Sequence, residues 1–162
     1  MSTKPQSKQA ASSDELALEI VRVFNAPRHL VYATWTDPVH STKWGPQDMR
    51  IIHCEGDLRP GGKIRVGMRH DSGEEHWQVG EYVEIVENEL LVFTHAWDDG
   101  QGGTSLETLV RVEFEDAGPG RTRMIFRQTG FASAPIRDGH REGWTQAFDS
   151  MEGYLITLKT HQ

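Results

Sequence analysis

The sequence is poor in cysteine, in long apolar runs and in clustered basic residues, and each shortage excludes a class of protein. Cys54 is the only cysteine, so the chain can form no intramolecular disulfide and no thiolate metal cluster. No apolar stretch approaches the roughly 20 residues that span a bilayer, and the first residues lack the apolar core of a secretory signal. We therefore expect a cytoplasmic protein without membrane insertion.

Basic residues are too few and too scattered for a nucleic-acid-binding surface. The chain has 24 acidic and 17 basic residues and a formal charge of −7. Binding to nucleic acid draws most of its affinity from clustered cations that neutralise phosphates. We expect no nucleic-acid partner.

Eight histidines are present, but none lies in a recognised metal-binding spacing. His53 and Cys54 are neighbours in a strand pattern, where successive side chains point to opposite faces, and a turn separates His70 from His76. We therefore expect no metal and no cofactor. Four further histidines are expected at the surface: His29, His40, His140 and His161.

The 162 residues suit a single domain. Residues 1–14 are small and polar, a composition that buries too little apolar surface to offset the entropy of ordering. We expect a disordered leader there and one domain at residues 15–162. The apolar, β-branched run from Leu16 to Phe24 predicts a first strand of this domain.

Two short helices are predicted next, and then the pattern changes period. Ala26-Pro27 opens the first helix, and Asp37-Pro38 opens a second that ends at Trp44-Gly45-Pro46. Six later segments, separated by short turns, read as strands that pair antiparallel in a meander. They are Met49–Leu58, Lys63–His70, Glu75–Val86, Leu90–Trp97, Ser105–Phe114 and Arg121–Gln128. The last segment, Pro135–Thr160, regains helical spacing.

These elements predict an α+β fold in which a curved antiparallel sheet of about seven strands, with two short helices, wraps a long C-terminal helix. A sheet of this size twists strongly and tends to curl. One helix laid across it leaves volume at one end of the groove. We therefore expect a cavity between the sheet and the long helix.

Five short motifs stand in a characteristic order along the chain. They are Arg22-Val23-Phe24-Asn25-Ala26-Pro27, Ala33-Thr34-Trp35-Thr36-Asp37-Pro38, Lys43-Trp44-Gly45-Pro46, Asp57-Leu58-Arg59-Pro60-Gly61-Gly62 and Gly143-Trp144-Thr145-Gln146. From about Leu16 to Leu155 the chain resembles the START-like helix-grip (SRPBCC) superfamily. Within it, the chain is most similar to the bacterial single-domain homologues of the activator of heat-shock protein 90 ATPase. The resemblance implies a hydrophobic cavity between the sheet and the long helix.

The lining of this cavity is expected to be apolar and aromatic, as in most ligand pockets. The predicted ligand-binding residues are Met68, Trp77, Phe93, His95, Trp97, Trp144 and Phe148. Trp35 and Trp44 are expected to be structural.

Two side chains are weak catalytic candidates. His95 shares strand parity with Phe93 and Trp97, so on an inner face its imidazole would project into the cavity as a hydrogen-bonding group or general base. A core histidine satisfied by a polar neighbour is the alternative. Glu81 shares parity with Trp77, with a solvated strand edge as its alternative.

Three functions follow from this pattern. The leading one is a non-enzymatic protein that binds a small apolar or aromatic molecule. The second is a cyclase- or dehydratase-type enzyme, which requires His95 and Glu81 to converge in the cavity with perturbed pKa values. The third is a chaperone-interacting protein. A homodimer is compatible with so small a domain.

Overall fold

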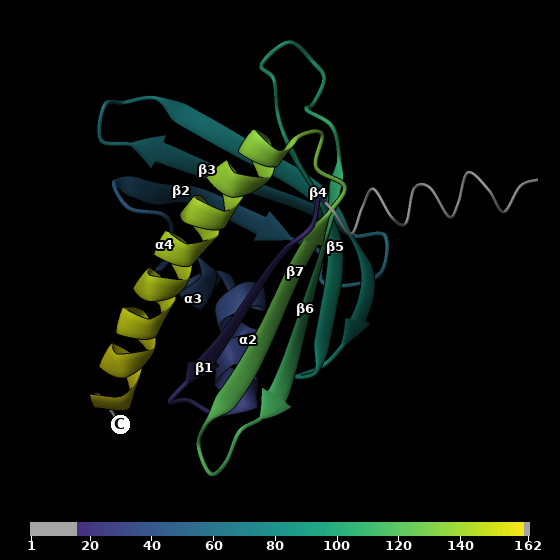
Figure 1. Cartoon of the computed structure of the whole chain (residues 1–162). Coiled ribbons are helices and arrows are strands. Elements are labelled where there is room, and N and C mark those ends of the chain that lie inside the picture. The colour runs from purple at the N-terminus through teal and green to yellow at the C-terminus, as the bar shows by residue number, and fades with distance from the viewer. Residues whose placement is uncertain (1–15, 161–162) are drawn as a thin grey trace, which may run out of the picture.

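Strand β1 (Leu18–Phe24) begins close to the start of residues 16–160, the part of the chain that the structure, a computed structural model, describes (Figure 1). The predicted leader at residues 1–14 and the predicted surface residue His161 lie outside this range. In β1 the first and last side chains are buried and those between them alternate in exposure. The strand therefore has one face against a core.

Two short helices follow β1 and cover one end of the sheet (Figure 1). Helix α2 (Arg28–Thr36) begins after Pro27, at a position where a missing N–H has no intrahelical partner. It buries Val31 and Tyr32 against the core. The predicted first helix is thereby confirmed.

Helix α3 (Pro38–Ser41) is a single turn, shorter than predicted. Its start is fixed by Asp37, whose carboxylate accepts the backbone N–H of Val39 at 3.0 Å. The chain beyond it folds back, because the indole N–H of Trp44 donates to the carbonyl oxygen of Thr34 at 2.8 Å. That contact, and not a longer helix, places Trp44.

The predicted strands form one seven-stranded antiparallel sheet with the order β1-β7-β6-β5-β4-β3-β2. The six strands after the short helices are β2 (Met49–Gly56), β3 (Lys63–His70), β4 (Glu75–Val86), β5 (Leu90–Trp97), β6 (Thr108–Asp116) and β7 (Thr122–Thr129). They form the predicted meander, and β1 joins its far edge, with Leu18 opposite Gln128. Only β6 starts clearly later than predicted, at Thr108 in place of Ser105.

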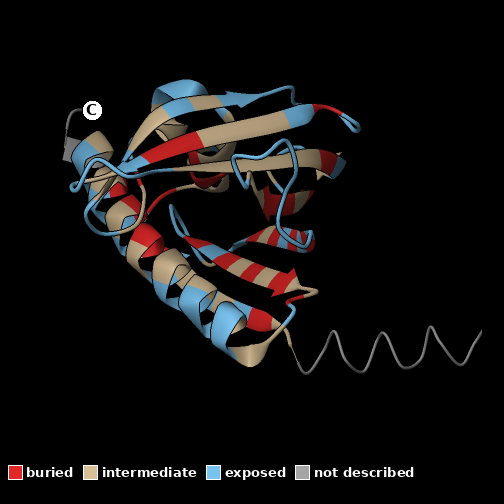
Figure 2. Ribbon diagram, turned by 90° about the horizontal axis from the view of Figure 1, so that it is seen from above, coloured by how far each residue is buried: buried red, intermediate tan, exposed pale blue. Residues whose placement is uncertain are grey.

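Helix α4 (Ala134–Thr160) lies across the concave face of the curled sheet (Figure 1). Its buried residues form one stripe, seen in Figure 2 as the red and tan side of the helix, with the exposed residues opposite. Two ion pairs hold it to β1: the guanidinium of Arg22 lies 3.0 Å from Asp149 and 2.7 Å from Glu152. Within residues 16–160, no helix combines the length and apolar character needed to cross a membrane.

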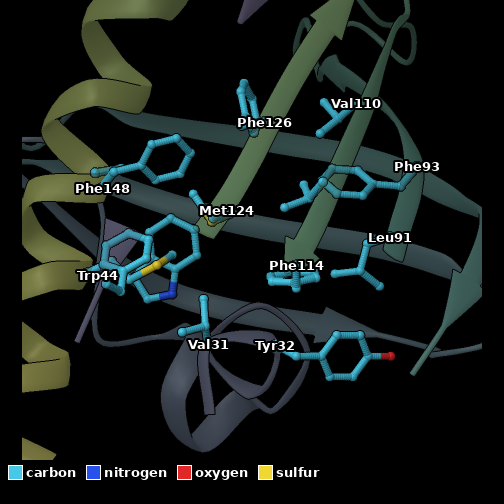
Figure 3. Close-up of a cluster of buried hydrophobic side chains, with 14 of the residues drawn as sticks. Val31, Tyr32, Trp44, Leu91, Phe93, Val110, Phe114, Met124, Phe126 and Phe148 are labelled. Carbon is cyan, nitrogen blue, oxygen red and sulfur yellow. The ribbon is translucent and has the colours of Figure 1, made fainter. Parts of the chain in front are cut away.

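The groove between sheet and helix is packed on one side (Figure 3). There, aromatic and aliphatic side chains from α2, α4, β1 and β5–β7 form the core, among them Phe93, Phe126 and Phe148. The ring of Phe148 lies 5.3 Å from that of Phe126, edge to face. The other side, under β2–β4, is left for the cavity.

Candidate ligand-binding cavity

A cavity of about 530 Å³ lies between β2–β5, the two short helices and the N-terminal half of α4. This size falls within the range of small-molecule sites. The apolar lining comprises Trp35, Pro38, Trp44, Pro46, Met49, Ile51, Ile64, Val66, Met68, Leu91, Phe93, Trp97, Ile136, Trp144 and Ala147. The polar lining comprises Thr36, Ser41, Cys54, Glu55, Gln78, Tyr82, His95 and His140.

The alternation of side chains along the strands determines which residues face the cavity. In β3, Ile64, Val66 and Met68 face the cavity, as the alternation predicted. In β2 the register shifts between Ile51 and His53, so the inward face passes from Ile51 to Cys54. Such a bulge changes which residues point inward.

Five of the seven predicted ligand-binding residues line the cavity: Met68, Phe93, His95, Trp97 and Trp144. The last four of these come from β5 and α4, which face each other across the groove. Whether any of them binds a ligand stays a prediction.

The prediction that Trp77 lines the cavity is wrong. Its indole lies across Gly67 on the opposite face of the sheet, so close that a Cβ on Gly67 would come within 2.6 Å of the ring. The guanidinium of Arg65 stacks over the same ring at 4.5 Å. Trp77 therefore packs on the outer face of the sheet.

The prediction that Phe148 lines the cavity is also wrong. The side chain is fully buried, and its ring lies within about 6 Å of those of Trp35, Trp44 and Trp144. All three tryptophans line the cavity and Phe148 does not, so Phe148 packs against residues of the wall without facing the open volume.

Glu81 lies on the same outer face as Trp77. Its carboxylate pairs with the ammonium group of Lys63 at 2.6 Å, and the side chains of Glu81 and Lys63 are 45% and 82% exposed. The solvated alternative therefore holds, and the fold does not bring Glu81 and His95 together. The acid–base pair that the cyclase or dehydratase hypothesis requires is not formed by these two residues.

His95 is the most deeply buried polar group of the lining, with 2% of its surface exposed. Its ring meets those of Trp97, Trp144 and His140 at centroid distances of 5.3, 5.8 and 5.8 Å. Burial lowers the pKa of the imidazole from 6.5 to about 3, and the neighbouring His140 adds to the effect. The ring is therefore neutral at physiological pH.

The ring nitrogens of His95 make no hydrogen bond to another residue among those described. Fully enclosed side-chain nitrogens and oxygens all have partners within residues 16–160. A ring nitrogen without a partner is therefore not fully enclosed, and His95 is part of the cavity lining. The alternative of a core histidine satisfied by a polar neighbour stays open, because the ring is buried and one nitrogen bonds to its own backbone.

His140 was predicted at the surface, and it is half-exposed but also lines the cavity. Its Nε2 accepts the indole N–H of Trp97 at 3.0 Å, and its Nδ1 lies 2.8 Å from the carbonyl oxygen of Ile136. Both bonds are satisfied only by a neutral ring with its hydrogen on Nδ1. The signal was available, because His140 lies four residues before Trp144 and so on the same face of the helix.

A chain of hydrogen bonds fixes the other wall of this end. The indole N–H of Trp144 donates to Oε1 of Gln128 at 2.8 Å, and the amide of Gln128 donates to Thr108 at 2.8 Å. The hydroxyl of Thr108 donates to the backbone carbonyl of His95 at 3.0 Å. Trp144 and His95 are thus held relative to each other by buried bonds.

The end of the cavity under β2 carries neutral polar groups. The Cys54 thiol and the Ser41 hydroxyl lie 3.1 Å apart, and burial raises the pKa of the thiol. Burial also raises the pKa of the Tyr82 hydroxyl to about 12. These groups can hydrogen-bond a ligand but do not present an ionised nucleophile. No cluster of three or more histidine, cysteine or carboxylate side chains in residues 16–160 could hold a metal ion.

Trp35 and Trp44 were expected to be structural and are also part of the lining. Both pack in the core, with their rings 5.0 Å apart, and each presents part of its surface to the open volume. A motif in one sequence gives no sign that the same ring serves both purposes.

The curled antiparallel sheet, the long helix and the cavity between them define a START-like helix-grip fold. Residues 25–156 match the family described as "Activator of Hsp90 ATPase homolog 1-like protein". The chain belongs to this family.

Solved structures share the fold. A protein from Nitrosomonas europaea is 24% identical with a TM-score of 0.75, the match covering 90% of this chain and 97% of that one. An AHSA1 protein from Silicibacter pomeroyi is 21% identical with a TM-score of 0.78, covering 87% and 98%. A protein from Mycobacterium smegmatis is 26% identical with a TM-score of 0.74, covering 88% and 91%. Comparison with curated proteins gives no match.

Proposed function

We propose that the protein binds a small apolar or aromatic molecule in the cavity. The observation that carries the proposal is the lining itself: about 530 Å³ bounded by four tryptophans, Phe93 and aliphatic side chains. Water forms few hydrogen bonds with such an apolar surface. An apolar molecule that displaces this water is favoured, because apolar surface of both ligand and cavity is removed from water.

The hydrogen bonds of the four tryptophans support the proposal. Their indole N–H groups all donate within the protein, to a sulfur of Met124, a carbonyl oxygen of Thr34, a nitrogen of His140 and an oxygen of Gln128. Only the apolar ring surfaces are left to face the volume. The walls are thereby positioned before any ligand arrives, which reduces the entropy cost of binding.

A matched pair of variants tests the proposal. Val66 lies on the inner face of β3 and lines the cavity, whereas Val83 on β4 is 51% exposed. We expect Val66→Trp to fill the cavity and Val83→Trp to leave it open. Binding of the neutral fluorescent probe N-phenyl-1-naphthylamine should weaken more than about tenfold in the first variant, a loss above about 1.4 kcal/mol.

The second variant should bind as the wild type does. Far-ultraviolet circular dichroism and a urea midpoint confirm that both variants fold. Equal probe affinity in all three proteins would place the binding elsewhere, and no binding to the wild type would contradict the proposal. Contact with Hsp90, to which the family description refers, stays a prediction from the resemblance.

A further inference from the structure

Among residues 16–160, no lysine or arginine lines the cavity, and Glu55 is the one carboxylate that does. The side chain of Glu55 is 63% exposed and lies 3.2 Å from His53. A ligand anion in this volume would lose its hydration without gaining a cation. Burying an unpaired charge in a protein interior costs on the order of several kcal/mol.

Most polar groups near His95 are already engaged. The indole nitrogens of Trp97 and Trp144 both donate within the protein, and His140 uses both of its ring nitrogens. The imidazole of His95 differs, because it is 2% exposed, makes no hydrogen bond to another described residue and meets the open volume. One ring nitrogen donates to the backbone of His95 itself, so the other is left to accept a hydrogen bond.

We infer that the ligand is an uncharged apolar or aromatic molecule with a hydroxyl group, and that this hydroxyl donates a hydrogen bond to the imidazole of His95. The inference rests on the proposed function and names the class of ligand. The faces of Trp97 and Trp144 hold the apolar body next to that bond. Gln78 and Tyr82 add neutral polar groups elsewhere on the lining.

The neutral state of His95 agrees with this assignment. Burial lowers the pKa of its ring to about 3, so it does not become a cation that could hold a carboxylate near neutral pH. With its donor nitrogen engaged by its own backbone, the neutral imidazole instead recognises a group that donates a hydrogen bond. A hydroxyl is such a group.

Three probes of nearly the same size test the inference by isothermal titration calorimetry at neutral pH: naphthalene, β-naphthol and β-naphthoate. They differ in having no polar group, a neutral hydroxyl or an ionised carboxylate. Each is measured on the wild type and on His95→Leu. His95→Gln, which keeps a hydrogen-bonding group, is a second variant in case the first does not fold.

We expect β-naphthol to bind the wild type about five- to tenfold more tightly than it binds His95→Leu, the worth of one net hydrogen bond. Naphthalene should bind both proteins equally, and β-naphthoate should bind the wild type more weakly than β-naphthol. In His95→Gln, β-naphthol should keep part of its advantage.

The outcomes separate the two claims. If naphthalene and β-naphthol bind but lose nothing in either variant, or if β-naphthoate binds best, this inference is overturned and the proposed function stands. If none of the three probes binds the wild type, the proposed function itself fails, and the inference falls with it.

Discussion

The deep burial of His95 predicts how the stability of the protein depends on pH. In the unfolded chain the imidazole takes up a proton as the pH falls through 6.5, whereas in the folded protein it does so only near a pKa of about 3. Between these values the unfolded state binds more protons, so the free energy of unfolding falls as the pH falls. Above the unfolded-state pKa of 6.5, His95 makes no contribution to the pH dependence of stability.

The expected slope is about 1.4 kcal/mol per pH unit below the unfolded pKa. From neutral pH to about pH 5, His95 should therefore remove about 2 kcal/mol from the free energy of unfolding. His95→Leu lacks the titrating group, and at neutral pH it should be as stable as the wild type or more so, because it no longer keeps a polar ring in an apolar wall.

Urea unfolding of both proteins across this pH range measures the effect. The difference in stability between variant and wild type should widen by about 2 kcal/mol towards acid. His95→Gln also lacks an imidazole and should show the same shallower pH dependence. If the wild type and both variants lose stability in parallel, the imidazole is not a buried neutral group and the reasoning is refuted.

Three further predictions separate the core, the cavity wall and the outer face. Trp144→Phe should lower the free energy of unfolding by about 1–3 kcal/mol, because it removes the donor from the fully buried amide oxygen of Gln128. Trp97→Phe should lower it by less than about 1 kcal/mol, since its partner His140 is half-exposed and water can replace the bond. Equal losses in urea unfolding would contradict this. Phe148→Ala truncates a core residue and should lower the free energy of unfolding by about 3–5 kcal/mol. Ile136→Ala, at a residue that is 48% exposed, should lower it by less than about 0.5 kcal/mol. A small loss for Phe148→Ala would mean that its ring belongs to the cavity wall. Glu81→Gln should change stability by less than about 1 kcal/mol and leave β-naphthol binding unchanged; weaker binding in calorimetry would link Glu81 to the cavity after all.

The fold and the inner face of two strands could be predicted because their patterns are regular. In β3 and β5 the side chains alternate without a bulge, so parity alone assigns Val66, Met68, Phe93 and His95 to one face of each strand. In β2, where the register shifts after Ile51, parity alone could not give the inner face.

Trp77 and Glu81 do share one face of β4, as their parity predicted, but that face is the outer one. Both faces of β4 carry large side chains, so hydrophobicity does not distinguish them. The hairpin register does, because it places Trp77 opposite Gly67, and directly paired residues share a face. Gly67 alternates with Val66 and Met68, which face inward, so Trp77 had to face outward. The same reasoning places Glu81, opposite Lys63, outside.

The error at Phe148 has no such local signal. Trp144 and Phe148 lie one turn apart on the same stripe of α4, and helical periodicity treats them alike. What separates them is the position at which the helix passes from the open half of the groove to the packed half. That position depends on how Trp35, Trp44 and Phe126 fill the space, which is a property of the assembled fold.

This division of the groove connects stability to function. The packed half, with Phe126 and Phe148 fully buried, supplies the apolar burial that holds the sheet and α4 together. The open half can then keep a volume and a polar group such as His95 that a well-packed core would exclude. Trp35, Trp44 and Trp144 stand at the boundary, each anchored by its own indole hydrogen bond. In the proposed binding function, a ligand would therefore meet a wall that the core already fixes, and binding would require no rearrangement of the residues that keep the protein folded.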